Sequence, residues 1–165
     1  MKPTITLLTL LFSAFATSNS LSFFGGDQQV LDEDLKVPGD NPLYYCQKTD
    51  NYSLTIDKVD LTPNPPSPGK TLTIKAKGNF TEDVEEGAYI NLSVKYGLIR
   101  LINQRADLCE QMKNVDEECP LSGGKTITKD VDLPKEIPPG SYTVLADVYT
   151  SSDEQVTCLN AHVKF

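Results

Sequence analysis

Few residues in this chain have the types and spacing that catalysis requires. His162 is the only histidine, and it falls on the solvent side of an alternating stretch with no nucleophile or base near it in sequence. Asp130 and Asp132 share one strand face, whereas glycoside hydrolysis needs two carboxylates opposed across a cleft. Gly123-Gly124-Lys125-Thr126 lacks the first glycine of a phosphate-binding loop, because Cys119-Pro120 stands in its place. We therefore predict no catalytic residues and a protein that is not an enzyme.

The four cysteines offer a second kind of chemistry. Cys46, Cys109, Cys119 and Cys158 allow three disulfide pairings. A zinc site is disfavoured, because there is no Cys-x-x-Cys pair and only one histidine. We predict no metal and no cofactor. Cys109 and Cys119 flank a polar stretch and are natural local partners, which leaves Cys46 and Cys158 to tie the first strand to the last.

The N-terminus has the features of a secretory leader. Lys2 precedes an apolar run from Leu7 to Phe15 that is too short to span a bilayer, and Ala14-Phe15-Ala16 follows as a cleavage site. We predict a signal peptide over residues 1–20. Residues 21–41 are rich in Asp and Gly without periodicity, which indicates a pro-segment or a loosely held arm. One domain then remains, over residues 42–165.

A secretory leader would expose the chain to N-glycosylation. Three sequons occur, at Asn51, Asn79 and Asn91. Asn79 and Asn91 both fall on the polar side of alternating stretches, as a glycan would require. We predict that at least one of the three carries a glycan.

The charge of the chain limits its partners. The formal net charge is −8, the pI is about 4.6, and the lysines and arginines form no cluster. Nucleic acid is therefore an improbable partner, because phosphate binding needs a basic surface. Permanent attachment to an anionic membrane is also disfavoured, although brief docking through apolar residues stays open.

Short alternating runs separated by turn residues make up most of the chain beyond Pro42. Residues 88–97 (AYINLSVKYG) place Ile90, Leu92, Val94 and Tyr96 on one side and polar residues on the other. A phase shift near Val59 indicates a bulge. We predict an all-β, immunoglobulin-like antiparallel sandwich of about seven strands, with a helical turn near residues 108–113.

The inner faces of these strands contain many small residues and no tryptophan. One interpretation of this composition is a plain core that side chains fill completely. The other interpretation is an apolar cavity between the sheets. The stretch Gly97–Cys109 leaves a similar choice, because Leu98, Ile99, Leu101 and Ile102 either continue the strand over the core or form an apolar lip beside Arg100 and Arg105.

Five segments together resemble the fungal phosphatidylglycerol/phosphatidylinositol transfer proteins. They are VPGDNPLYYC, LTPNPPSPGKTLTIKAKG, VEEGAYINLSVKYGLIRL, DLCEQM with the later CP, and PPGSYTVLADVYTSSDEQVTCL. These proteins belong to the ML-domain lipid-recognition family, with the Niemann-Pick type C lumenal sterol carriers. The resemblance extends over most of residues 37–165, in order and with similar gaps. The third disulfide of animal members is missing here.

The resemblance implies two sheets splayed to hold a lipid, and bridges Cys46–Cys158 and Cys109–Cys119. We expect a soluble carrier that binds a phospholipid (phosphatidylinositol or phosphatidylglycerol) or a sterol and transfers it between membranes. A closed adhesion or recognition module without cargo is the alternative. The candidate cavity wall consists of Leu72, Ile74, Ile90, Leu92, Val94, Tyr96, Tyr142, Val144 and Val148. The candidate cavity mouth consists of Leu98, Ile99, Leu101, Ile102 and Pro120.

We further expect a monomer of the secretory pathway, destined for the vacuole lumen or secreted. Its partners would be the lipid, a membrane in transient contact and a membrane protein that accepts the lipid. The sequence leaves the preferred lipid open.

Overall fold

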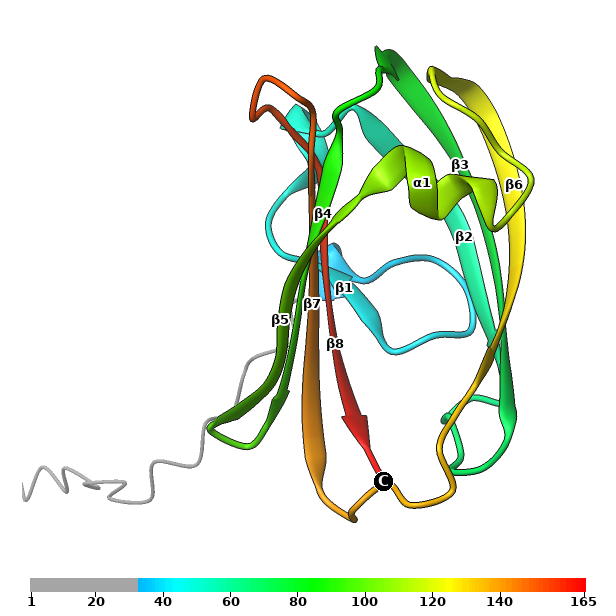
Figure 1. The fold of residues 1–165 in the computed structure, drawn as a ribbon, viewed down its shortest axis with the longest axis vertical. Helices are drawn as coiled ribbons and strands as arrows, with labels where there is room; N and C mark the ends of the chain where they lie inside the picture. Colours follow the sequence, from blue (N-terminus) through cyan, green and yellow to red (C-terminus); the bar gives the residue numbers. More distant parts are fainter. Residues whose placement is uncertain (1–32) are drawn as a thin grey trace, which may run out of the picture. The chain divides into compact units, whose positions relative to one another are not determined.

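The computed structural model describes residues 33–165, which form two antiparallel sheets and three short helices (Figure 1). The strands are β1 (Leu43–Tyr45), β2 (Leu54–Thr62), β3 (Thr71–Val84), β4 (Tyr89–Tyr96), β5 (Ile99–Asp107), β6 (Leu121–Asp132), β7 (Ser141–Tyr149) and β8 (Gln155–Lys164). The helices are η1 (Glu33–Leu35), η2 (Thr49–Asn51) and α1 (Leu108–Lys113). The predicted signal peptide and the first part of the predicted arm, residues 21–32, lie outside the described residues.

The eight strands divide into a five-stranded sheet and a three-stranded sheet. The first has the order β1-β8-β7-β4-β5 and the second the order β2-β3-β6. This confirms the all-β sandwich, with one strand more than predicted. The additional strand is β5, whose sequence IRLINQRAD lacks the clean alternation that marks the other long strands.

Strand β5 and strand β6 are the edges of their sheets on the same side of the sandwich. The chain passes from one to the other through α1, which crosses the upper part of the gap in Figure 1. Strands β1 and β2 are the edges on the opposite side. The predicted bulge is present in β2, where the register with β3 shifts between Ile56 and Lys58.

Both predicted disulfides are present. Cys46 follows β1 and is bonded to Cys158 in β8, with Cα atoms 5.4 Å apart. Cys109 in α1 is bonded to Cys119 just before β6, with Cα atoms 5.7 Å apart. The first bridge therefore links residues 112 positions apart, and the second closes a loop of local residues.

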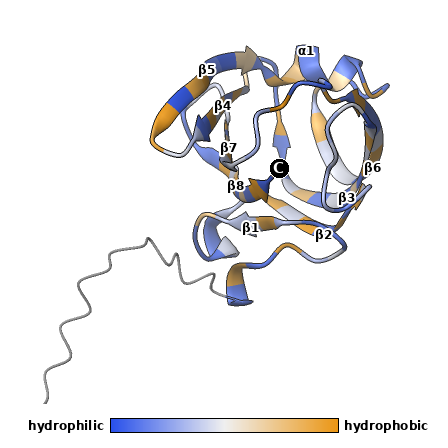
Figure 2. Cartoon of the chain, turned by 90° about the horizontal axis from the view of Figure 1, so that it is seen from below, coloured by the Kyte–Doolittle hydropathy of each residue, from blue (hydrophilic) through white to orange (hydrophobic). Residues whose placement is uncertain are grey.

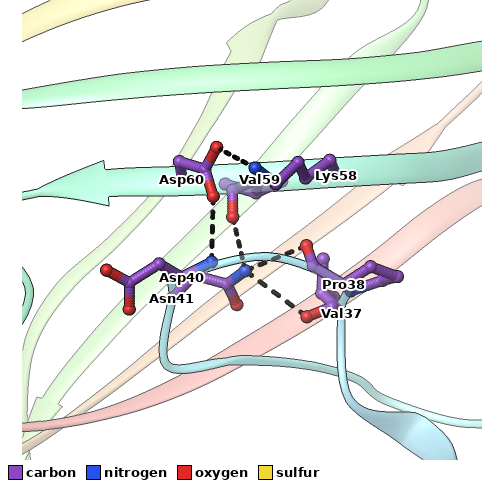
Figure 3. Close-up of polar contacts among 7 residues, drawn as sticks. All are labelled: Val37, Pro38, Asp40, Asn41, Lys58, Val59 and Asp60. Atoms are coloured by element: carbon purple, nitrogen blue, oxygen red, sulfur yellow. Dashed lines mark hydrogen bonds and ion pairs between the residues drawn. The ribbon is translucent and has the colours of Figure 1, made fainter.

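The segment that precedes β1 is held against β2 by hydrogen bonds (Figure 3). The buried Asn41 side chain donates to the carbonyl of Val59 at 2.7 Å, and Val59 N–H donates to Pro38 O at 2.8 Å. Asp40 N–H donates to Asp60 Oδ1 at 3.0 Å. Val37 is fully buried in the core. Residues 37–41 of the predicted arm are thus packed onto the domain, and the processing of residues 21–41 stays a prediction.

Candidate functional site

An apolar cavity of about 270 Å³ lies between the two sheets. Its lining residues are predominantly aliphatic or aromatic and come from both sheets and from α1. They are Leu43, Leu54, Ile56, Val59, Ile74, Ala76, Lys77, Gly78, Phe80, Ile90, Leu108, Met112, Leu121, Lys125, Ile127, Ala146, Val148, Val156, Thr157 and Leu159. Such a space suits a hydrocarbon group.

Helix α1 covers one end of the cavity. Its first and fifth residues, Leu108 and Met112, contribute side chains to the lining. Asp107 caps the helix, because its Oδ1 accepts a hydrogen bond from Glu110 N–H at 2.9 Å. The Cys109–Cys119 bridge ties the helix to the segment that enters β6. The sequence therefore fixes this short helix by a cap and a disulfide rather than by its length.

Three lining residues carry polar groups: Lys77, Lys125 and Thr157. The Lys125 ammonium lies 2.6 Å from Glu117 in the segment that follows α1. Thr157 is 3% exposed, and its hydroxyl makes no hydrogen bond. The polar atoms are few, so a ligand in this cavity is held chiefly by apolar contact.

The nine predicted wall residues do not all line this cavity. Ile74, Ile90 and Val148 do. Leu72, Leu92, Val94, Tyr96, Tyr142 and Val144 are buried or half-buried on the same strand faces but are not among its lining residues. Six of the nine positions therefore lie outside the space that a ligand could enter without rearrangement. The role of all nine in lipid binding stays a prediction.

The two tyrosines among them have another place in the fold. Tyr96 and Tyr142 lie with ring centroids 5.1 Å apart at the end of the sandwich opposite α1. Tyr142 also packs against Phe165, with centroids 5.5 Å apart. Desolvation raises the pKa of the Tyr142 hydroxyl, which donates a hydrogen bond to Pro138 O.

Four of the five predicted mouth residues form an exposed apolar patch on the β4–β5 hairpin. The exposed fractions are 98% for Leu98, 62% for Ile99, 55% for Leu101 and 41% for Ile102. Figure 2 shows hydrophobic residues at this end of β5. The preceding strand does not continue through this stretch: β4 ends at Tyr96, the chain turns at Gly97 and Leu98, and β5 pairs antiparallel with β4. The side chains of Leu98, Ile99, Leu101 and Ile102 do not cover the core. None of them lines the cavity, and neither does the exposed Pro120.

Sequence reasoning missed several lining residues. Leu108 and Met112 gave no signal, because six helical residues are too few for an amphipathic pattern. Val156 and Thr157 are adjacent in sequence and both line the cavity. In a regular strand, adjacent side chains point to opposite faces, so the alternation pattern predicts only one of them on the inner face. The register shift between β7 and β8 at Val148 and Tyr149 accounts for this exception. Ala76, Phe80, Ile127, Ala146 and Leu159 did show inward phase in the sequence.

Of the residues first considered for catalysis, His162, Asp130 and Asp132 are not among those that line the cavity. His162 Nδ1 lies 3.1 Å from Thr143 Oγ1. Asp130 and Asp132 accept hydrogen bonds from Thr73 and Thr71, each at 2.7 Å. Within residues 33–165, no group of three or more histidine, cysteine, aspartate or glutamate side chains is arranged to hold a metal ion. The same residues contain no helix long and apolar enough to span a bilayer.

The three sequon asparagines differ in surroundings. Asn51 lies exposed in η2, and Asn79 lies exposed on β3. Asn91 is half-buried on β4, and its Oδ1 accepts a hydrogen bond from Arg105 Nε at 3.0 Å. Their glycosylation stays a prediction.

The fold and the cavity define a β-sandwich that encloses an apolar space between two sheets. The family model described as ML domain matches residues 40–165, and the chain belongs to this family.

Two relatives share the name "Phosphatidylglycerol/phosphatidylinositol transfer protein". The one from Aspergillus fumigatus is 57% identical over 95% of this chain and 91% of its own. The one from Pyricularia oryzae is 61% identical over 82% of this chain and 78% of its own. Among solved structures, a Niemann-Pick type C2 protein from Japanese carpenter ant has the same fold, with a TM-score of 0.52 and 13% identity. That match covers 74% of this chain and 97% of the ant protein.

Proposed function

We propose that this chain is a lipid carrier of the secretory pathway, which holds a phospholipid or a sterol between its sheets and transfers it between membranes. The apolar cavity of about 270 Å³ is the observation that carries this proposal. A sealed sandwich fills its inter-sheet layer of roughly 10 Å with interdigitating side chains. The printed names of the two fungal relatives, which concern transfer of phosphatidylglycerol and phosphatidylinositol, support the same function.

Shelter from water is the physical task of such a carrier. Exposing hydrocarbon costs roughly 0.8 kcal/mol per methylene, so a long acyl chain costs about 12 kcal/mol in water. Contact with the aliphatic walls of the cavity offsets this cost during transfer. No covalent bond is made or broken, so the proposed activity needs neither a catalytic residue nor a cofactor.

The size of the cavity sets a condition on binding. Pockets for drug-sized ligands have volumes of roughly 300–1,000 Å³, and this cavity has about 270 Å³. A diacyl phospholipid exceeds that space. Side chains next to the present lining, such as Leu92, Val94 and Val144, would have to move when the lipid enters. These predicted wall residues would then join the site in the loaded protein.

The exposed patch on the β4–β5 hairpin is the proposed point of membrane contact. Leu98 is almost fully exposed, and Lys95 and Arg100 lie beside it in the hairpin. Apolar side chains can enter the bilayer surface while the basic groups meet anionic headgroups. Because the whole chain has a net charge of −8, such a contact would be transient.

We include in the proposal that the carrier is a monomer, that its destination is lumenal or vacuolar, and that a membrane protein accepts the lipid.

The closed adhesion module is the second candidate, and the cavity counts against it. A vesicle assay tests the proposal: donor vesicles contain a fluorescent phosphatidylinositol or a fluorescent ergosterol analogue, and transfer to acceptor vesicles is followed with time. The proposal predicts that the purified protein accelerates transfer of at least one probe. Absence of transfer for both probes would reject it.

A matched pair of variants tests the membrane contact separately. Leu98→Asp should slow transfer while leaving the amount of bound lipid unchanged. Leu145→Asp replaces another exposed apolar residue, 37% exposed on β7, and should have no effect. Equal behaviour of the two variants would contradict a docking role for the hairpin.

A further inference from the structure

Two lysines lie on the inner face of the edge strand β6. Lys125, Ile127 and Lys129 alternate with more exposed neighbours along the strand. Their register partners on β3 are Gly78, Ala76 and Ile74, all three of which line the cavity. The two ammonium-bearing side chains therefore lie on the same face as the apolar wall.

Lys125 already has a partner. Its ammonium lies 2.6 Å from the Glu117 carboxylate, and the two side chains are 27% and 21% exposed. This ion pair joins β6 to the segment that follows α1. Lys125 thus has a structural role in holding the cover of the cavity in place.

Lys129 differs, because its side chain makes no hydrogen bond or salt bridge within residues 33–165. The carboxylates nearest in sequence, Asp130 and Asp132, accept hydrogen bonds from β3 threonines on the other side of the sheet. Across the gap, β5 contains no carboxylate from Ile99 to Ala106. A half-buried lysine residue without a counter-ion is unusual in a chain of net charge −8.

We propose that Lys129 selects lipids whose headgroup carries a net negative charge. Lys129 is the register partner of the lining residue Ile74, and β6 is the edge strand on the side of the sandwich where β5 is also an edge, so a long side chain that starts here can extend along the apolar wall toward that edge. A phosphodiester placed there gains a charge-assisted hydrogen bond while its acyl chains occupy the cavity. A choline headgroup gains less, because its own positive charge opposes the lysine. This inference rests on the proposed carrier function and adds the residue that decides between headgroups.

A structural role is the competing explanation. Inward-pointing charges on an edge strand prevent two sheets from pairing edge to edge, and lysine is common for this purpose. Either sign of charge would serve that role. Headgroup selection requires a positive charge. The sign of the charge therefore separates the two explanations.

The experiment compares transfer of pyrene-labelled phosphatidylglycerol with transfer of pyrene-labelled phosphatidylcholine. Donor and acceptor vesicles keep the same phosphatidylcholine matrix, so that membrane charge is constant. We expect the wild-type protein to prefer phosphatidylglycerol and Lys129→Glu to reduce this preference by about tenfold. Lys129→Arg should retain it. Lys75→Glu, on the outer face of β3, is the matched control and should also retain it.

Each outcome has one meaning. An unchanged preference in Lys129→Glu, with a soluble monomeric variant, would overturn the inference and leave edge protection as the role of Lys129. Equal transfer of both lipids by the wild-type protein would overturn it as well, while the carrier function stands. If the wild-type protein moves neither lipid, the carrier function itself fails for these cargoes. A melting temperature for each variant checks that the fold is intact.

Discussion

Tyr96 on β4 and Tyr142 on β7 are register partners whose hydroxyls donate to successive carbonyls of one loop. Tyr96 OH donates to Pro139 O at 3.0 Å, and Tyr142 OH donates to Pro138 O at 2.9 Å. That loop connects β6 to β7 and therefore passes from one sheet to the other. The tyrosine pair thus fixes the loop at the end of the sandwich opposite α1, and this end is held by polar contacts as well as by packing.

Gly140 in this loop lies against the ring of Tyr96. Its φ is +152°, and a Cβ atom there would lie 2.4 Å from Cε2 of Tyr96. We predict that Gly140→Ala lowers the free energy of unfolding by about 2–3 kcal/mol, through backbone strain and displacement of the ring. Urea unfolding measures the change. Gly97→Ala is the control, because φ is +54° but no atom lies within 4 Å, and it should cost about 1 kcal/mol. Similar losses in both variants would show that the ring moves freely.

Ala146 offers a way to fill the cavity. Its side chain lines the space from β7, between Val144 and Val148 on the same face. We predict that Ala146→Phe abolishes lipid binding and leaves the melting temperature within a few degrees, because the ring occupies existing space. In a closed core the same change would cost roughly 1–3 kcal/mol. Lipid retention and thermal unfolding are measured on the same sample. Leu145→Phe, which points outward from the same strand, should change neither quantity.

Asp60 links the stability of the domain to acidity. The hydrogen bond from Asp40 N–H and the ion pair with Lys58 hold the pKa of this carboxyl below its usual value. A lowered pKa stabilises the fold fully above the unfolded pKa of about 3.9, and this contribution is lost as the pH falls through the folded value. We therefore expect Asp60→Asn to lower the urea midpoint at pH 6 and to have a smaller effect at pH 3. Asp57→Asn, which removes a carboxylate of the same strand without these two contacts, is the control for the loss of one negative charge. A gap between Asp60→Asn and wild type that stays constant from pH 6 to pH 3 would contradict the assignment.

The two disulfides should differ in their contribution to stability. Cys46 and Cys158 are 112 residues apart, whereas Cys109 and Cys119 are 10 residues apart. On the chain-entropy model the first bridge contributes about 5 kcal/mol and the second about 2.7 kcal/mol. Replacing each pair by alanine and measuring denaturant unfolding should reproduce this order. The reverse order would mean that the cover formed by α1 matters more to global stability than the tie between the first and last strands.

Much of the fold could be predicted from alternation alone, and the exceptions have physical causes. The face that contains Ile90 and Val148 follows from a period of two, and so does the outward position of Asn79. Strand β5 was not predicted as a separate strand, because its apolar residues Ile99, Leu101 and Ile102 are exposed rather than buried and do not alternate with polar residues. A strand that pairs through its backbone while exposing both sides gives no hydrophobic signal.

The cavity itself could be predicted only in part. Sequence shows which residues face inward, but it does not show how far apart the two sheets stand at each position. Leu92 and Val94 therefore looked like Ile90, although only Ile90 lines the cavity. Leu108 and Met112 depend on a helix that is positioned by a cap and a disulfide, which are tertiary features. Lys129 could be placed on the inner face by phase, but its lack of a counter-ion required the structure.

Native mass spectrometry of the glycan-trimmed protein, after incubation with vesicles of mixed phospholipids and ergosterol, measures cargo most directly. The account predicts a complex whose added mass equals one lipid molecule in the wild-type protein, and its absence in Ala146→Phe. A wild-type protein that stays empty under these conditions, or that retains the same lipid when the cavity is filled, would contradict the carriage of lipid between the sheets.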